Sequence, residues 1–198
     1  MSPDAAWPGG AVGKGRGTMR AGRVERREER RDERRGGDEG PEVYVMREKL
    51  VSIGDDFRIE TNRGRRAFKV DGKAVRVRDT LVIRDVQGQE VAKLQERLVA
   101  VRDTMTIDRP GRPDATIKKA LIAPLRERWV LEAADVGQIT IQGNIVDHEY
   151  TFEAGGRKIA ETSKRWLRVR DTYGVEIAPG ADTALILAAT VAIDQMAH

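Results

Sequence analysis

The chain has 198 residues, enough for one domain and an extension, and it contains no cysteine, so disulfides and thiol chemistry are excluded. Its net charge of +4 is spread thinly: residues 1–42 hold 10 Lys and Arg against 9 Asp and Glu, which leaves 26 against 23 for the rest. A dedicated nucleic-acid binder carries a dense basic stripe, so we expect no nucleic-acid partner. No apolar stretch near the N-terminus resembles a secretory signal, and we expect a cytoplasmic protein.

Residues 1–42 are predicted to be an extension outside the fold. Residues 1–17 are rich in Gly, Pro and Ala, and residues 20–35 interleave Arg with Glu and Asp without an apolar face. Such a segment buries no core, so we expect it to be disordered or, at most, a solvated single helix with cross-turn ion pairs. The folded domain is predicted to span residues 43–198.

Short alternating segments, typical of strands, follow the extension. Apolar and polar residues alternate in residues 57–61, 74–78, 81–85 and 138–142. Turn signals separate the strands at residues 62–64, 71–72, 87–88, 144 and 155–156, and Asp71-Gly72 is the strongest two-residue hairpin signal. Prolines at positions 110, 113 and 124 predict a longer loop or a sheet edge in the middle of the domain.

The tetrapeptide Val-Arg-Asp-Thr occurs three times, at residues 77–80, 101–104 and 169–172. Residues 91–104 also align with residues 159–172, with six identities in fourteen positions, which predicts two similar sheet units that bury their apolar faces together. A ligand contact by each arginine is one interpretation. Structural ion pairs at equivalent corners are the simpler one, because Asp and Thr are good turn residues. The predicted structural pairs are Arg78 with Asp79, Arg102 with Asp103, and Arg170 with Asp171.

Residues 182–197 form a helix-like segment that is apolar on every side, with Asp182 or Thr183 placed to cap it. A helix without a polar face must be surrounded, and its apolar run, residues 184–193, is shorter than the roughly 20 residues that a membrane span needs. We therefore predict a sheet closed around this central helix, with membrane insertion as the alternative. Asp194, near the helix end, is expected to form a structural ion pair with one of the repeated arginines.

The chain contains few residues that could act in catalysis. No serine lies in a nucleophile-elbow motif beside His148, and no phosphate-binding loop motif is present in the domain. Residues 147–149 offer three metal-ligating side chains in a row, but alternate strand residues face opposite sides and a second ligand cluster is missing. We therefore expect no catalytic residue, no metal and no cofactor.

Several short sequence motifs follow one another along the domain. They occupy residues 44–49, 68–72, 81–85 with 91–92, 143–144 with 147–150, 166, 171–176 and 192–196. In this order they resemble the LURP-one-related family, which belongs with the tubby C-terminal domain and the phospholipid scramblases. The resemblance implies a mainly β fold, a closed antiparallel barrel of about twelve strands around a central C-terminal helix. It also implies a link to lipid, because tubby domains bind phosphoinositide head groups.

The leading functional hypothesis is a non-enzymatic, monomeric module that docks weakly on anionic phospholipid head groups at the membrane periphery. Each basic residue near an anionic surface adds only about 1 kcal/mol, so several must act together. The predicted head-group contacts are Lys118, Lys119, Arg126, Arg128, Lys164 and Arg165. The alternatives are a small-ligand-binding barrel or a protein-interaction scaffold and, more remotely, a hydrolase.

Overall fold

The computed structural model describes residues 40–47, 57–72, 80–97, 104–120, 127–144, 147–167 and 172–197. All of them belong to one compact unit, residues 40–198. The predicted strand at residues 74–78, Arg126 and the Arg-Asp pairs of the three repeats lie outside the described residues. The predicted boundary of the extension at residue 42 stays a prediction.

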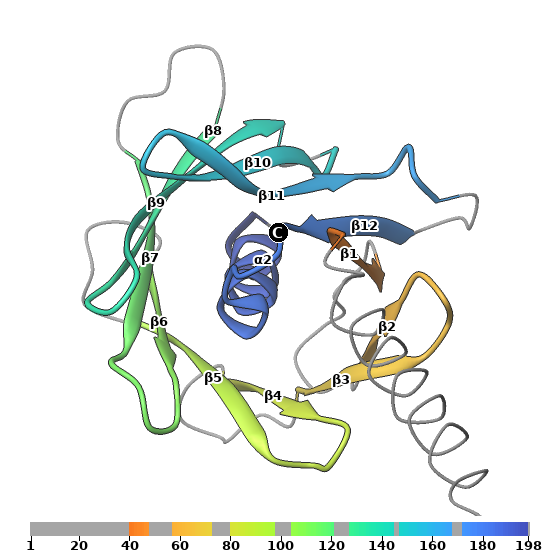
Figure 1. Cartoon of the computed structure of the whole chain (residues 1–198). Coiled ribbons are helices and arrows are strands. Elements are labelled where there is room, and N and C mark those ends of the chain that lie inside the picture. Colours follow the sequence, from red (N-terminus) through yellow and green to blue (C-terminus); the bar gives the residue numbers. More distant parts are fainter. Residues whose placement is uncertain are drawn as a thin grey trace, which may run out of the picture. The chain divides into compact units, whose positions relative to one another are not determined.

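The described residues form twelve strands, and each strand pairs antiparallel with its neighbours in the chain. The strands are β1 (Glu42–Arg47), β2 (Phe57–Thr61), β3 (Arg66–Asp71), β4 (Thr80–Asp85), β5 (Glu90–Glu96), β6 (Thr104–Asp108), β7 (Ala115–Lys119), β8 (Glu127–Ala133), β9 (Gly137–Asn144), β10 (Glu149–Ala154), β11 (Arg157–Ser163) and β12 (Thr172–Ile177). Strand β1 also pairs with β12, from Glu42 opposite Ile177 to Arg47 opposite Thr172, so the sheet closes into a barrel (Figure 1). Closure removes the exposed edges at which other chains could add, and the predicted mainly β barrel is confirmed.

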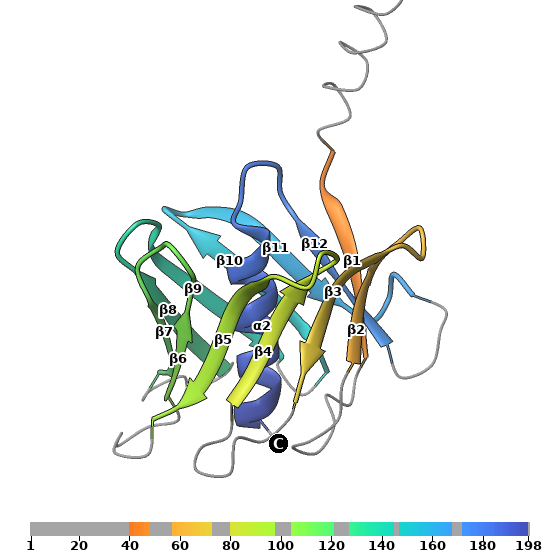
Figure 2. The same ribbon diagram turned by 90° about the horizontal axis from the view of Figure 1, so that it is seen from below.

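Helix α2 (Thr183–Ala197) runs through the inside of this barrel (Figures 1 and 2). Every residue from Leu185 to Asp194 is buried, and the predicted cap is present, because the Leu185 amide donates to Asp182 Oδ1 over 3.1 Å. Within the part of the chain that the structure describes, no helix combines the length and the apolar character needed to cross a membrane. The predicted central helix is therefore confirmed.

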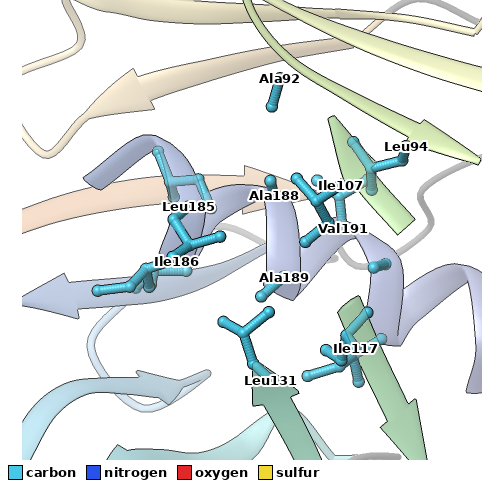
Figure 3. Close-up of a cluster of buried hydrophobic side chains, with 14 of the residues drawn as sticks. Ala92, Leu94, Ile107, Ile117, Leu131, Leu185, Ile186, Ala188, Ala189 and Val191 are labelled. Carbon is cyan, nitrogen blue, oxygen red and sulfur yellow. The ribbon is translucent and has the colours of Figure 1, made fainter. Parts of the chain in front are cut away.

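The core lies between this helix and the inward side chains of the strands. On β8, Trp129, Leu131 and Ala133 are buried, while Arg128 and Glu132, which alternate with them, are exposed. Figure 3 shows the helix residues Ala188 and Val191 near Leu94 of β5 and Ile107 of β6. Each fully buried aliphatic side chain stabilises the fold by about 1.5–3 kcal/mol, so the helix contributes a large part of the stability.

The two ends of the barrel differ. The end at which α2 begins carries the turns β2–β3, β4–β5, β6–β7, β8–β9 and β10–β11, and we call it the mouth (Figure 2). The turns predicted at residues 62–64, 87–88 and 155–156 are all found here, with their glycines at positive φ. The opposite end, at which α2 ends, we call the base. The prolines at positions 110 and 113 lie in the β6–β7 turn, and no sheet edge occurs there.

The two-residue hairpin predicted at Asp71-Gly72 is wrong. Asp71 ends β3 but pairs with Val82, so the connection to β4 is much longer than two residues. The register is set by pairs of inward residues such as Val70 opposite Ile83, both fully buried, because a shift by one residue would turn every apolar side chain outward. Core packing here outweighs the local turn signal.

The three tetrapeptide repeats all end at the base of the barrel. The threonine of each copy, at positions 80, 104 and 172, is the first residue of β4, β6 and β12, and even-numbered strands all start at the base. The longer aligned segments place the buried residues Ala92 on β5 and Ala160 on β11, six strands apart in the ring of twelve. The two segments therefore occupy opposite sides of the barrel.

Candidate functional site

Lys118 and Lys119, two of the residues predicted to contact lipid head groups, form ion pairs with glutamates. Lys118 Nζ lies 2.9 Å from both carboxylate oxygens of Glu132, and Lys119 Nζ lies 2.8 Å from Glu127 Oε1. Lys119 also lies over the ring of Trp129, with its Nζ 5.5 Å from the ring centroid. These pairs contribute little stability at the surface, but they cancel the charge that the two lysines would offer to an anionic ligand.

The predicted contacts Lys164 and Arg165 lie in a short turn at the base, directly after β11. The turn is closed by the Leu167 amide, which donates to the Lys164 carbonyl over 3.3 Å, and by the Arg165 amide, which donates to Ser163 Oγ over 3.1 Å. Glu149 Oε1 accepts from the Ser163 hydroxyl over 2.9 Å and from the Lys164 amide over 3.2 Å. These bonds stabilise the turn formed by residues 163–167, which we call the tryptophan turn.

Trp166 lies at the centre of the tryptophan turn and covers a glycine on the outer face of β12. A Cβ atom added at Gly174 would lie 2.9 Å from Trp166 Cε3 and 3.6 Å from a methyl carbon of Val43, so only glycine lets the indole ring lie this close. The ring is nevertheless 40% exposed, and the neighbouring Arg165 side chain is 85% exposed, with its Nε 3.7 Å from Glu149 Oε1. The turn thus presents a held aromatic ring beside the exposed cationic side chain of Arg165.

A second polar cluster lies buried inside the barrel, between the end of α2 and strands β10 and β12. The Tyr173 hydroxyl donates to Asp194 Oδ2 over 2.5 Å, and His148 Nδ1 lies 3.4 Å from Asp194 Oδ1. The His148 ring stacks on Tyr173 with centroids 4.2 Å apart, and His148 adopts a φ of 51°. Burial, with the nearby Asp194 charge, raises the pKa of Tyr173 well above its usual range, so this hydroxyl stays a hydrogen-bond donor.

We interpret this buried cluster as a structural contact that fixes the end of the helix to the barrel wall. Asp194 is 2% exposed and His148 is 1% exposed, so neither side chain reaches a substrate from solvent. The predicted ion pair of Asp194 with a repeated arginine stays a prediction, because those arginines lie outside the described residues. Among the described residues, no group of three or more His, Cys, Asp or Glu side chains is arranged to hold a metal ion.

A third polar cluster lies at the mouth and was not predicted. The buried Arg109 donates to Asp135 Oδ1, to Asp182 Oδ2 and to the Pro113 carbonyl. The exposed Arg112 donates to Asp135 Oδ2 over 2.9 Å and to Asp182 Oδ2 over 2.5 Å. Chiefly because of the hydrogen bond from Arg109, the pKa of Asp135 falls to about 2. These four charged side chains, which we call the mouth cluster, tie the β6–β7 and β8–β9 turns to the start of α2.

The tryptophan turn and the mouth cluster differ in how visible they are in the sequence. Trp166 belongs to the family motifs, and its place directly after Lys164 and Arg165 is also an aromatic-basic pattern that can indicate a surface contact. Arg109 and Asp182 are separated by 73 residues, so no local pattern could have paired them. Arg128 is exposed on the outer face of β8, and its predicted contact with a lipid head group stays a prediction.

Comparisons with known proteins place the chain in a family. Residues 42–194 match the model of the LURP-one-related family. The X-ray structure of a protein from Arabidopsis thaliana is similar, with a TM-score of 0.61 and 19% sequence identity over 81% of this chain and 93% of that one; at this identity the likeness shows the fold alone. A search of curated proteins found no match. Because the matched residues cover most of the chain, this barrel belongs to the LURP-one-related family.

Proposed function

We propose that this LURP-one-related barrel is a non-catalytic module that docks weakly on anionic phospholipid surfaces through the tryptophan turn. The observation that supports the proposal is the exposed Arg165 beside Trp166, whose indole ring is held on Gly174. Tryptophan is favoured at membrane interfaces because its ring is apolar on the faces and carries an N–H donor at one edge. An aromatic ring that is already held in place loses little further conformational freedom on binding.

The expected affinity is low. Lys164 and Arg165 would each gain about 1 kcal/mol near an anionic leaflet. The nearby Glu149 carboxylate offsets part of that gain. Burial of the exposed part of the Trp166 ring adds an apolar term that does not depend on salt. The sum predicts reversible, peripheral docking that weakens as the ionic strength rises.

The other predicted contacts have secondary roles in this proposal. Lys118 and Lys119 must leave their glutamate partners before they meet a phosphate, so their net contribution is expected to be small. Arg128 is exposed and is expected to add to the docking surface only if the barrel lies on the membrane with β8 facing it. The tryptophan turn therefore carries most of the expected binding.

Liposome flotation of the full chain tests the proposal. Vesicles of phosphatidylcholine alone are compared with vesicles that also contain phosphatidylserine, at low and at physiological salt. Arg165→Glu is expected to weaken binding to the anionic vesicles about tenfold or more. The matched control is Arg157→Glu, at the exposed start of the same strand β11, which is expected to bind like the wild type. Equal loss in both variants would show general electrostatic attraction and refute the assignment to the turn.

The aromatic part of the proposal has its own test. Trp166→Ala is expected to weaken flotation even at high salt, whereas Val86→Ala, which removes an exposed apolar side chain from the β4–β5 turn, is expected to leave it unchanged. Absence of flotation for the wild type in every vesicle would refute lipid docking and favour a protein partner for this surface, because Trp and Arg also dominate protein interfaces.

A further inference from the structure

A hollow opens at the mouth of the barrel, beside the first turn of α2. Its volume is about 690 Å³, within the range of about 300–1,000 Å³ that is usual for small-molecule sites. The wall combines one part of the mouth cluster with side chains of β9, β10, β11 and the start of α2. The hollow lies at the opposite end of the barrel from the tryptophan turn.

The deeper wall of this hollow is apolar. Phe68 and Ile159, which are partly buried, give it an accessible apolar surface, and the fully buried core residues Ile139 and Ile186 lie next to it. Ala181, beside the helix cap, lines it with a small side chain, so a larger residue at this position would take up part of the space. A ligand that fills the hollow must therefore have an apolar body.

The polar wall belongs to the mouth cluster, which as a whole carries no net charge: Arg112, Asp135 and Asp182 line the hollow, and the fourth member, Arg109, is buried. The mouth cluster contains two guanidinium groups and two carboxylates, and all four carboxylate oxygens already accept hydrogen bonds, from Arg109, from Arg112 and from the Leu185 amide. Arg112 has five N–H groups, and its contacts with Asp135 and Asp182 use three of them, one on each guanidinium nitrogen. Its side chain is 47% exposed and lines the hollow, so the remaining N–H groups are available to an acceptor.

We propose that this hollow binds a small neutral amphipathic molecule, with its apolar body against Phe68 and Ile159 and a carbonyl-type acceptor on the Arg112 guanidinium. A neutral ligand is expected because the balanced charges of the mouth cluster attract neither a cation nor an anion. This site is independent of lipid docking, since neither Arg112 nor the hollow belongs to the tryptophan turn.

The test is a fluorescence titration of the full chain with three dyes. Prodan is a neutral naphthalene with a carbonyl acceptor, N-phenyl-1-naphthylamine is a neutral naphthalene without one, and 1-anilinonaphthalene-8-sulfonate is an anion. We expect saturable binding of Prodan and weaker binding of the anion. Ala181→Trp should fill the hollow and weaken Prodan binding about tenfold or more, whereas Val86→Trp, on the exposed β4–β5 turn, should leave it unchanged.

The role of Arg112 is read from the ratio of two affinities. Arg112→Met is expected to weaken binding of Prodan more than binding of N-phenyl-1-naphthylamine, a difference that a general loss of stability would not produce. If Ala181→Trp fails to fold, Val136→Trp at the rim of the hollow replaces it. Absence of saturable Prodan binding, equal binding by the filled variant, or equal loss in Val86→Trp would each overturn the proposal.

Discussion

Replacing Gly143 with alanine tests how closely two neighbouring strands approach near the base of the barrel. Gly143 pairs with Glu127 on β8 and with Tyr150 on β10, and its φ of 152° is one that side-chain-bearing residues rarely adopt. An added Cβ would lie 2.3 Å from the Glu149 carbonyl oxygen and 2.5 Å from Tyr150 Cα, so the backbone of β10 would have to move. In the alanine variant, the strained φ would lower the free energy of unfolding by about 1–3 kcal/mol, and the displacement of β10 would lower it by about 1–3 kcal/mol more.

We therefore expect Gly143→Ala to lower the free energy of unfolding by about 2–6 kcal/mol, out of a total of about 5–15 kcal/mol. The measurement is equilibrium urea unfolding, followed by far-UV circular dichroism. The matched control is Gly156→Ala, because Gly156 has a φ of 76° but no atom within 4 Å of the added Cβ, so only about 1–2 kcal/mol is expected. Equal losses in the two variants would refute the close approach of β9 and β10 at this point.

Three further changes test the buried contacts and the charge network. Tyr173→Phe removes a buried hydrogen bond to a carboxylate and should cost about 1.5–3 kcal/mol in thermal unfolding, more than Tyr44→Phe, whose hydroxyl bond to a carboxylate is less buried. Because Arg109 lowers the Asp135 pKa to about 2, the stability that this group gives is present above about pH 4 and is lost as the pH falls through 2. In urea unfolding, Asp135→Asn should thus be less stable than the wild type at pH 6, and the difference should shrink as the pH falls from 4 to 2 and below. Removal of residues 182–198 should abolish cooperative melting, and a soluble truncation that still melts cooperatively would contradict the central-helix packing.

The fold was predictable because the apolar C-terminal helix is stable only where it is surrounded by other apolar side chains. The run from residue 184 to residue 193 has no polar face, and the short alternating strands before it supply the surface that a buried helix needs. Turns were predicted correctly at Gly64 and Gly88, where a glycine at positive φ lies within a short connection between neighbouring strands. Asp71-Gly72 failed because the inward pairing of β3 with β4 sets the register, and that pairing is not visible from the turn itself.

The candidate sites were less predictable because each one depends on residues that are distant in the chain. The basic residues are visible in the sequence. The carboxylates that pair with Lys118 and Lys119 lie on the neighbouring strand β8, and the pairing of β7 with β8 cannot be read from the sequence pattern. The position of Trp166 depends on the absence of a side chain at Gly174, which reads in the sequence as an ordinary strand glycine. The mouth cluster joins three separate connections in the same way.

The helix that fills the barrel follows all twelve strands in the chain, and this order has a consequence for synthesis. As the ribosome releases the chain, β1 has no partner for its second edge until β12 has emerged, and the inward side chains have no core until α2 follows. Pairings between distant segments form slowly, and exposed strand edges invite aggregation in the meantime. We therefore expect this barrel to complete its folding only after α2 has left the ribosome, and nascent chains that stop before it to depend on chaperones.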